Sequence, residues 1–210
     1  PPRSTLFPYT TLFRSTGAVV GGIAATIISK LVGEDSAKQL IEELKKQPRK
    51  YQIFISSTFK ELEKERSVAI NTINRLGHIP RAMEFFPSSC DNSWDYITKI
   101  LVECDFMLLI LGNEYGHTMK DEDGREKSIT EMEYEYAIEH KIPVFPIKYI
   151  KNENDKIDER QKSFIDKVSS KNQRPTANIE SLGAIIAQTL MELGNYNRPG
   201  WISWKLFEET

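Results

Sequence analysis

The sequence predicts an α/β fold with three layers, a parallel sheet covered by helices on both faces. Apolar runs of strand length at 51–56, 106–111 and 144–149 alternate with segments of helical periodicity. Buried parallel strands read as continuous apolar runs, and helices return the chain between them. Short polar motifs follow these runs, at the carboxyl ends of the strands, where ligands bind in such sheets.

The elements follow one another in a regular strand–helix order. Strands are expected at 51–56, 79–84, 106–111, 144–149 and 176–179. Helices are expected at 60–76, 94–104, 130–141, 158–170 and 181–193, and a long polar loop at 112–127. Right-handed crossovers then give the flavodoxin-like order 2-1-3-4-5, whose switch point lies between the first and third strands.

The helices are supported by apolar stripes and by residues that begin or end them. In the first helix Leu62, Ala69 and Ile73 share one face, and Gly77 ends it. Ser93 is placed to cap the second helix. The later helices show the same spacing of apolar residues, which favours packing on a sheet.

Composition limits the classes of function. The chain has 210 residues, 40% hydrophobic and 28% charged, which suits one globular domain with a small extension. A net charge of -2 gives no basic footprint, so no nucleic-acid partner is expected. Cys90 and Cys104 form no disulfide framework, which favours a reducing, cytoplasmic location. The histidines lack metal-ligand spacing, so no metal site is expected.

The N-terminal part stands apart from this domain. Residues 5–15 resemble the in-frame translation of a common sequencing adapter, so residues 1–15 are treated as an artefact. Residues 16–48 hold an apolar segment and a connector helix, and the α/β domain covers 51–205. Other interpretations stay open: the acid-free start resembles a transit peptide, and the run 17–28 suits a signal-peptide core or the end of a membrane segment.

Arg66 is a charge within a buried helical stripe. It falls four residues after Leu62 and three before Ala69. A guanidinium that faces a sheet needs a partner, because an unpaired buried charge is very costly. Glu84, at the end of the expected strand 79–84, is the natural candidate. A structural ion pair is favoured over direct contact with a ligand.

Polar motifs near the switch point supply candidate ligand contacts. Hydroxyls and backbone N–H groups after the first strand attract phosphate or carboxylate, although one hydroxyl could simply cap the helix. Glycines after the third strand allow close backbone approach to a ligand, and Tyr115 could stack on a base or pack within the turn. The candidate residues are Ser56, Ser57, Thr58, Phe59, Gly112, Tyr115, Gly116, Ser128 and Thr130.

Two glutamates in the helix at 130–141 are the candidate catalytic groups. Glu133 borders the stripe that faces the sheet, and Glu131 lies on the neighbouring face. Acidic residues at a helix start are favoured by the helix dipole in any case. That structural explanation suits Glu131 better than Glu133.

The motifs together resemble a bacterial domain family of unknown function, numbered 4062. The matching stretches are Ile53-Phe54-Ile55-Ser56-Ser57-Thr58-Phe59, Leu62-x-x-Glu65-Arg66, Met83-Glu84-x-Phe86, Cys104-Asp105, Gly112-x-x-Tyr115-Gly116, Ser128-x-Thr130-Glu131-x-Glu133-Tyr134 and Arg198-Pro199-Gly200-Trp201. They fall in order over about residues 51–203. The family is similar to TIR and SEFIR domains and, more distantly, to nucleoside deoxyribosyltransferases.

The resemblance implies a TIR-like fold and a nucleotide ligand. In TIR enzymes a glutamate of the corresponding helix supports cleavage of NAD. Glu133 matches that position, with Ala137 four residues later, although the aromatic-Cys pair that often precedes this glutamate is absent. The implied function is cleavage of the N-glycosidic bond of NAD, as substrate and not as cofactor, in a bacterial signalling or phage-defence protein.

Two alternatives remain open beside this function. TIR-like domains also serve as non-catalytic modules that bind a nucleotide or self-associate, which makes a homo-oligomer a possible partner. Deoxyribosyl transfer would use the same site on nucleosides. Because the family is typically an N-terminal module of larger NTPase or repeat proteins, further domains upstream or downstream are also expected.

Overall fold

The computed structural model describes residues 12–14, 33–35, 38–39, 48–85, 94–121, 123–150, 155–170, 175–196, 198 and 200–203. They belong to two compact units. The larger unit spans Tyr51–Tyr196, and the smaller one combines Pro1–Lys50 with Asn197–Thr210.

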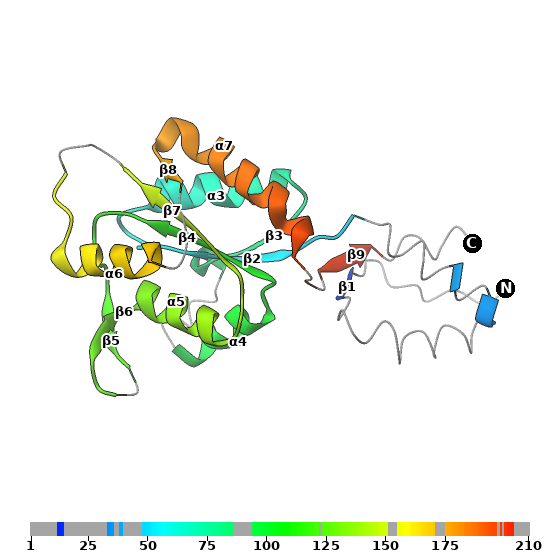
Figure 1. The fold of residues 1–210 in the computed structure, drawn as a ribbon, viewed down its shortest axis with the longest axis horizontal. Coiled ribbons are helices and arrows are strands. Elements are labelled where there is room, and N and C mark those ends of the chain that lie inside the picture. Colours follow the sequence, from blue (N-terminus) through cyan, green and yellow to red (C-terminus); the bar gives the residue numbers. More distant parts are fainter. Residues whose placement is uncertain are drawn as a thin grey trace. The chain divides into compact units, whose positions relative to one another are not determined.

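The larger unit is built on a five-stranded parallel sheet with the order β3-β2-β4-β7-β8 (Figure 1). The strands are β2 (Gln52–Ser56), β3 (Ile79–Arg81), β4 (Phe106–Leu111), β7 (Val144–Tyr149) and β8 (Thr176–Ala177). Numbered along the chain, this order is 2-1-3-4-5, so the expected fold class is confirmed. In the central pair, Ile53 lies opposite Phe106 and Ser56 opposite Leu109.

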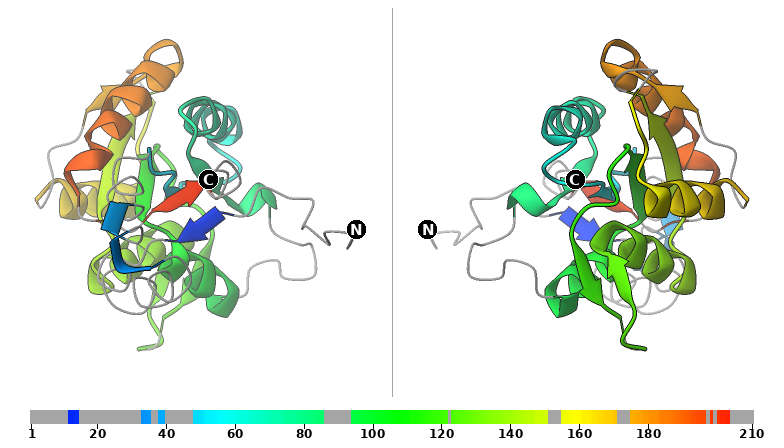
Figure 2. Two further views of the ribbon diagram at one scale, coloured as in Figure 1. Left: turned by 90° about the vertical axis from the view of Figure 1, so that its right-hand side faces the viewer. Right: turned by 90° about the vertical axis from the view of Figure 1, so that its left-hand side faces the viewer.

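Helices cover both faces of the sheet (Figures 1 and 2). On one face lie α3 (Glu63–Arg75) and α7 (Ile179–Leu190); on the other lie α4 (Trp94–Glu103), α5 (Ile129–Glu139) and α6 (Glu159–Ser169). The side chains of β2 alternate between two apolar clusters. Ile53 and Ile55 join the cluster with α3 and α7, whereas Phe54 joins the cluster with α4, α5 and α6.

The expected loop at 112–127 contains a hairpin, so that part of the prediction is wrong. Its strands are β5 (Thr118–Lys120) and β6 (Glu126–Ser128), which pair antiparallel. Gly124 has a φ of 78° in the turn, and the Asp121 carboxylate accepts hydrogen bonds from the backbone of Asp123 and Arg125. Both strands have only three residues and few of these are apolar, so they lack the apolar alternation that predicts a strand.

The ends of several elements also differ from the sequence prediction. The strand expected at 79–84 ends at Arg81, and the 3₁₀ helix η2 (Met83–Phe85) follows it. The helix expected at 60–76 begins at Glu63, with Leu62 as an N-cap that has no side-chain hydrogen bond. The hydroxyls after β2 therefore do not cap this helix. Helix α7 begins earlier than expected, with Asn178 as its cap, and η4 (Met191–Asn195) follows it.

The smaller unit contains a two-stranded antiparallel sheet of β1 (Leu12–Arg14) and β9 (Trp201–Ser203). Lys50 adds a bridge to Trp201, and the Arg49 guanidinium donates to the Arg198 carbonyl at 2.9 Å. Strand β1 falls within the residues 1–15 that the sequence analysis set aside. The described positions of the connector segment, 34–35 and 38–39, are helical, and the rest of 16–47 lies largely outside the described residues.

Within the described part of the chain, no helix has both the length and the apolar character needed to cross a bilayer.

Candidate functional site

A cavity of about 850 Å³ opens at the carboxyl ends of β2 and β4. Its wall comes from the loops after these two strands, from the first turns of α5, and from the segment that leads into α6. The lining residues are Ser57, Thr58, Phe59, Lys60, Glu61, Met83, Asn113, Glu114, Tyr115, Gly116, His117, Thr118, Ile129, Thr130, Glu133, Lys156, Asp158 and Arg160. The chain changes direction across the sheet between β2 and β4, and this is where ligands bind in such folds.

Glu133 is the buried carboxyl group of this cavity. Only 3% of it is exposed, and its Oε2 accepts a hydrogen bond of 2.5 Å from the Ser56 hydroxyl at the end of β2. Burial raises the pKa of Glu133 to about 7, although the Ser56 hydrogen bond and the charge of Arg66 both act to lower it. The group therefore changes its charge near neutral pH, as many catalytic carboxyls do.

Arg66 lies behind the site, fully buried in α3. Its Nε and Nη2 donate to the two carboxylate oxygens of Glu84 at 2.7 Å each. Its Nη1 donates to the Ser57 hydroxyl at 2.9 Å and to the Ile55 carbonyl at 3.4 Å. Partial burial favours the neutral form of Glu84, but the hydrogen bonds and charge of Arg66 outweigh it and lower the pKa of Glu84. The guanidinium thus ties the end of β2 to η2.

Glu61 joins the loops after β2 and β4. Its carboxylate accepts from the Thr58 hydroxyl at 2.8 Å and from the backbone N–H groups of Asn113 and Glu114 at 2.7 and 3.1 Å. A Cβ on Gly112 would lie 2.5 Å from Glu61 Oε2, so the glycine leaves room for the carboxylate.

Gly116 makes the second close approach between these loops. Its φ is 80°, and a Cβ there would lie 2.4 Å from the Thr58 Cγ2. The sequence predicted glycines that approach a ligand closely. In the structure the partners of Gly112 and Gly116 are side chains of the neighbouring loop.

Tyr115 has its ring and its hydroxyl both occupied. The guanidinium carbon of Arg160 lies 4.2 Å from the ring centroid, and the hydroxyl donates to Glu131 Oε2 at 2.5 Å. Burial and the hydrogen bond to Glu131 raise the pKa of Tyr115. A base could stack on this face of the ring only after Arg160 moved, so the stacking role proposed for Tyr115 is not available as the side chains stand.

Glu131 does not reach the cavity. Its second oxygen accepts from Lys167 Nζ at 2.8 Å, so Tyr115 and Lys167 occupy both carboxylate oxygens. It is not among the described residues that line the cavity. As the side chains stand, the Glu131 carboxylate binds Tyr115 and Lys167 and not the cavity, and its expected action on a ligand stays a prediction.

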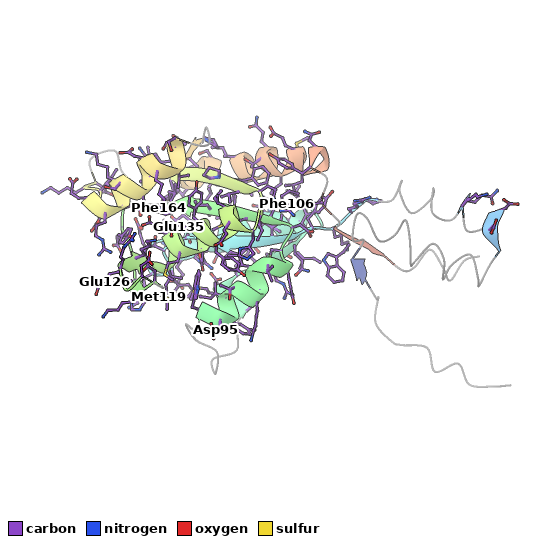
Figure 3. The ribbon with its side chains drawn as sticks, turned by 60° about the horizontal axis from the view of Figure 1, so that its bottom comes forward. Asp95, Phe106, Met119, Glu126, Glu135 and Phe164 are labelled. Atoms are coloured by element: carbon purple, nitrogen blue, oxygen red, sulfur yellow. The ribbon has the colours of Figure 1, made fainter. Side chains whose placement is uncertain are left out.

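A charged network braces the hairpin against α5 and α6. Lys127 pairs with Asp121 at 3.0 Å and with Glu135 at 2.8 Å, and Glu135 also binds Lys167. Figure 3 labels Glu135 on α5 and marks the hairpin by Met119 and Glu126. Partial burial disfavours the ammonium form, yet the carboxylates of Glu131 and Glu135 raise the pKa of Lys167. This network holds Glu131, and through it Tyr115, in place.

The other expected contacts divide into two groups. Ser57, Thr58, Phe59, Thr130 and Gly116 line the cavity together with Glu133. Ser56 contacts Glu133 directly. Ser128 does not line the cavity: it is 1% exposed, and its hydroxyl accepts from the backbone N–H of Glu131 as the N-cap of α5.

Sequence reasoning missed several lining residues, among them Lys60, Glu61, Lys156 and Arg160. The spacing Thr58-x-x-Glu61 matches a capping box, but Glu61 binds backbone N–H groups of the loop after β4, which no local spacing signals. Lys156 and Arg160 follow β7, which ends at the same edge of the sheet as β2 and β4. The position of β7 in the expected sheet could therefore have predicted these two residues near the site.

These features define a three-layer α/β domain with a polar cavity at the switch point of its sheet. The chain belongs to the domain-of-unknown-function family DUF4062, whose model matches residues 52–191. The resemblance seen in the sequence motifs is thereby confirmed. No curated protein matches the sequence.

Solved structures with some similarity include two TIR assemblies. The TIR domain heterodimer of RPS4 and RRS1 has 10% identity and a TM-score of 0.45, over 69% of this chain and 99% of that one. The TIR domains of the activated Roq1 resistosome, which recognizes the effector XopQ, have 12% identity and a TM-score of 0.39, over 69% and 84%. A flavo di-iron protein mutant from Thermotoga maritima has 11% identity and a TM-score of 0.39, over 79% and 41%.

Arg66→Ala should lower the free energy of unfolding by about 3 kcal/mol, because it removes one partner of a largely buried ion pair. The 28% exposure of Glu84 lets water reach the carboxylate left behind, which keeps the cost at the lower end of the usual range. Arg75→Ala, in the same helix but exposed, should cost no more than about 0.5 kcal/mol. Equal costs in urea denaturation would contradict a special role for Arg66.

Glu133→Gln should change how stability depends on pH. The pKa of Glu133 is about 7 in the folded chain and near its ordinary value of 4.5 when unfolded, so the folded state binds more protons between these values. Wild-type stability therefore falls as pH rises through this window, whereas the glutamine variant lacks that loss. The stability gained by the variant should grow from near zero at pH 4 to about 3 kcal/mol above pH 8.

Glu139→Gln is the matched control for this measurement, since Glu139 is exposed on the same helix. This control measures the general effect of removing one charge from the helix. A constant difference between Glu133→Gln and wild type, in urea denaturation from pH 4 to pH 9, would show that Glu133 does not titrate near neutrality.

Proposed function

We propose that this domain cleaves the N-glycosidic bond of NAD and releases nicotinamide. One observation carries the proposal: a buried carboxyl group, Glu133, lines a cavity at the switch point, and its pKa is raised to about 7. The Ser56 hydroxyl holds this group at 2.5 Å. The match of Glu133 to the catalytic position of TIR enzymes supports the proposal.

The reaction requires few catalytic groups from the protein. Nicotinamide in NAD is a cationic leaving group, so the bond between the ribose C1′ and the ring nitrogen breaks without a general acid, and its electron pair leaves with nicotinamide. The ionised Glu133 would stabilise the positive charge that develops on the ribose, or attack C1′ as glycosidase carboxylates do. Water then adds at C1′ and loses a proton, which gives ADP-ribose.

The remaining wall suits a dinucleotide. A volume of about 850 Å³ lies within the range of pockets that hold small ligands. The Arg66 guanidinium carbon lies 5.5 Å from the centroid of the Phe59 ring, and the 44% of Phe59 that is exposed offers an apolar surface for stacking. Lys60 and Lys156 line the same cavity, and neither has an acidic partner among the described residues. Two ammonium groups would help to balance the charge of a pyrophosphate.

The proposal also covers the kind of protein in which the domain acts and its location in the cell. From the resemblance to TIR-like domains we infer a role in a bacterial signalling or defence protein, in which the domain would act on a nucleotide and self-associate. The two cysteines form no disulfide framework, which favours the cytoplasm as the location. Both points rest on the sequence.

Incubation of the purified chain with NAD, followed by chromatography of nicotinamide, tests the proposal. Wild type should release nicotinamide, and Glu133→Gln should reduce the rate at least about 100-fold, because the swap keeps the shape of the side chain and removes the charge. Glu139→Gln should keep the wild-type rate, and Glu131→Gln should lose far less than Glu133→Gln. Calorimetry with NAD covers the main alternative: binding without release would identify a module that binds the nucleotide without cleaving it.

Ser56→Ala should move the pH profile of nicotinamide release to higher pH. The ionised form of Glu133 does the work, so the wild-type rate should rise with pH around a midpoint near 7. The Ser56 hydrogen bond lowers the pKa, and its loss should raise the midpoint by about one pH unit. A lower rate at every pH with an unchanged midpoint would mean that Ser56 does not set the charge of Glu133.

A further inference from the structure

The loops after β2 and β4 form a cradle of hydrogen-bond donors that holds a carboxylate. The donors are the backbone N–H groups of Asn113 and Glu114, at 2.7 and 3.1 Å, and the Thr58 hydroxyl, at 2.8 Å. All three converge on the carboxylate of Glu61. Among the described residues no lysine or arginine pairs with Glu61, so neutral donors alone balance its charge. Converging backbone N–H groups of this kind are typical of anion-binding sites.

The cradle is part of the cavity wall. Thr58, Glu61, Asn113 and Glu114 all line the cavity that Glu133 also lines. Gly112 leaves the space in which the carboxylate sits, since a Cβ there would come within 2.5 Å of its oxygen. The cradle therefore has the donors, the room and the access that a ligand anion needs.

We infer that this cradle is the phosphate subsite of the cavity, and that the Glu61 carboxylate occupies it until a nucleotide phosphate replaces it. The naming of a nucleotide rests on the proposed function, whereas binding of a phosphate does not. A phosphate offers the same donors more acceptor oxygens and more negative charge than a carboxylate. Lys60 and Lys156, on the wall of the same cavity, add counter-charge for a phosphate and are unpaired among the described residues.

Calorimetry with inorganic pyrophosphate, without divalent ions and at constant ionic strength, tests the subsite. Glu61→Gln should bind pyrophosphate about tenfold more tightly than wild type, because the neutral amide competes poorly for three donors. Glu63→Gln removes the same charge from an exposed neighbour and should stay within about twofold of wild type.

Gly112→Ala should act in the opposite direction. The new methyl group fills the space of the anion oxygen, so pyrophosphate binding should weaken at least about tenfold. The atoms it displaces belong to the end of the flexible Glu61 side chain, so the fold should persist in circular dichroism. Glu61→Ala serves as a second variant without the carboxylate and should also bind more tightly than wild type.

ADP-ribose in the same titrations separates a nucleotide ligand from free phosphate. It should bind more tightly than pyrophosphate and respond to Glu61→Gln by the same factor. ADP-ribose binding that ignores Glu61→Gln and Gly112→Ala would overturn the assignment of the subsite to a nucleotide.

Three results would overturn the inference itself. The first is an equal gain in pyrophosphate affinity for Glu61→Gln and Glu63→Gln. The second is an unchanged pyrophosphate affinity in Glu61→Gln and Gly112→Ala, together with lower thermal stability. The third is that no variant binds pyrophosphate. The second result would identify Glu61 as a structural link between the loops. Pyrophosphate binding requires neither Glu133 nor cleavage, so these outcomes are independent of nicotinamide release.

Discussion

The buried guanidinium of Arg66 is the constraint on which the rest of the site depends. A charge that is 1% exposed must find partners, and it finds Glu84, the Ser57 hydroxyl and the Ile55 carbonyl. These contacts fix the end of β2, which presents the Ser56 hydroxyl to Glu133. The same cation lowers the pKa of Glu133 against the effect of burial. Arg66 thus helps to fix the shape of the cavity floor and, after burial and the Ser56 hydrogen bond, also affects the charge of Glu133.

The burial of Glu133 lowers the stability of the folded chain when its carboxyl group is ionised. A carboxyl group that is 3% exposed, with one hydrogen bond and no direct cationic partner among the described residues, destabilises the folded chain whenever it ionises. A core position filled for stability alone would favour an apolar residue or a glutamine. The raised pKa therefore supports the proposed catalytic role of Glu133, since such costs persist mainly where a site requires them.

Part of this structure could be predicted from the sequence, because buried positions appear there as apolar runs or as apolar residues at regular spacing. The strand at 106–111 is apolar throughout and the strand at 144–149 is apolar except for Lys148, and Arg66 stands out only against the apolar stripe around it. The hairpin at 118–128 shows no such pattern, because each strand has only three residues and few of these are apolar. Contacts such as Arg160 on Tyr115 join distant loops through polar groups, and no spacing in the sequence records them.

The glycines after β4 illustrate what could not be predicted from the sequence, namely which group approaches them. A glycine marks a close approach, but it does not say whether the approaching group is a ligand or a side chain of the same chain. At Gly112 that group is the Glu61 carboxylate, held by the donors that an anionic ligand would use. A ligand anion and the Glu61 carboxylate would use the same donors in the same geometry, and they differ only in their affinity for these donors. A phosphate brings more charge to the cradle and finds Lys60 and Lys156 on the same wall, whereas Glu61 is tethered and always present. The tether makes the carboxylate an effective competitor at low ligand concentration, and the added charge lets a phosphate replace it as concentration rises.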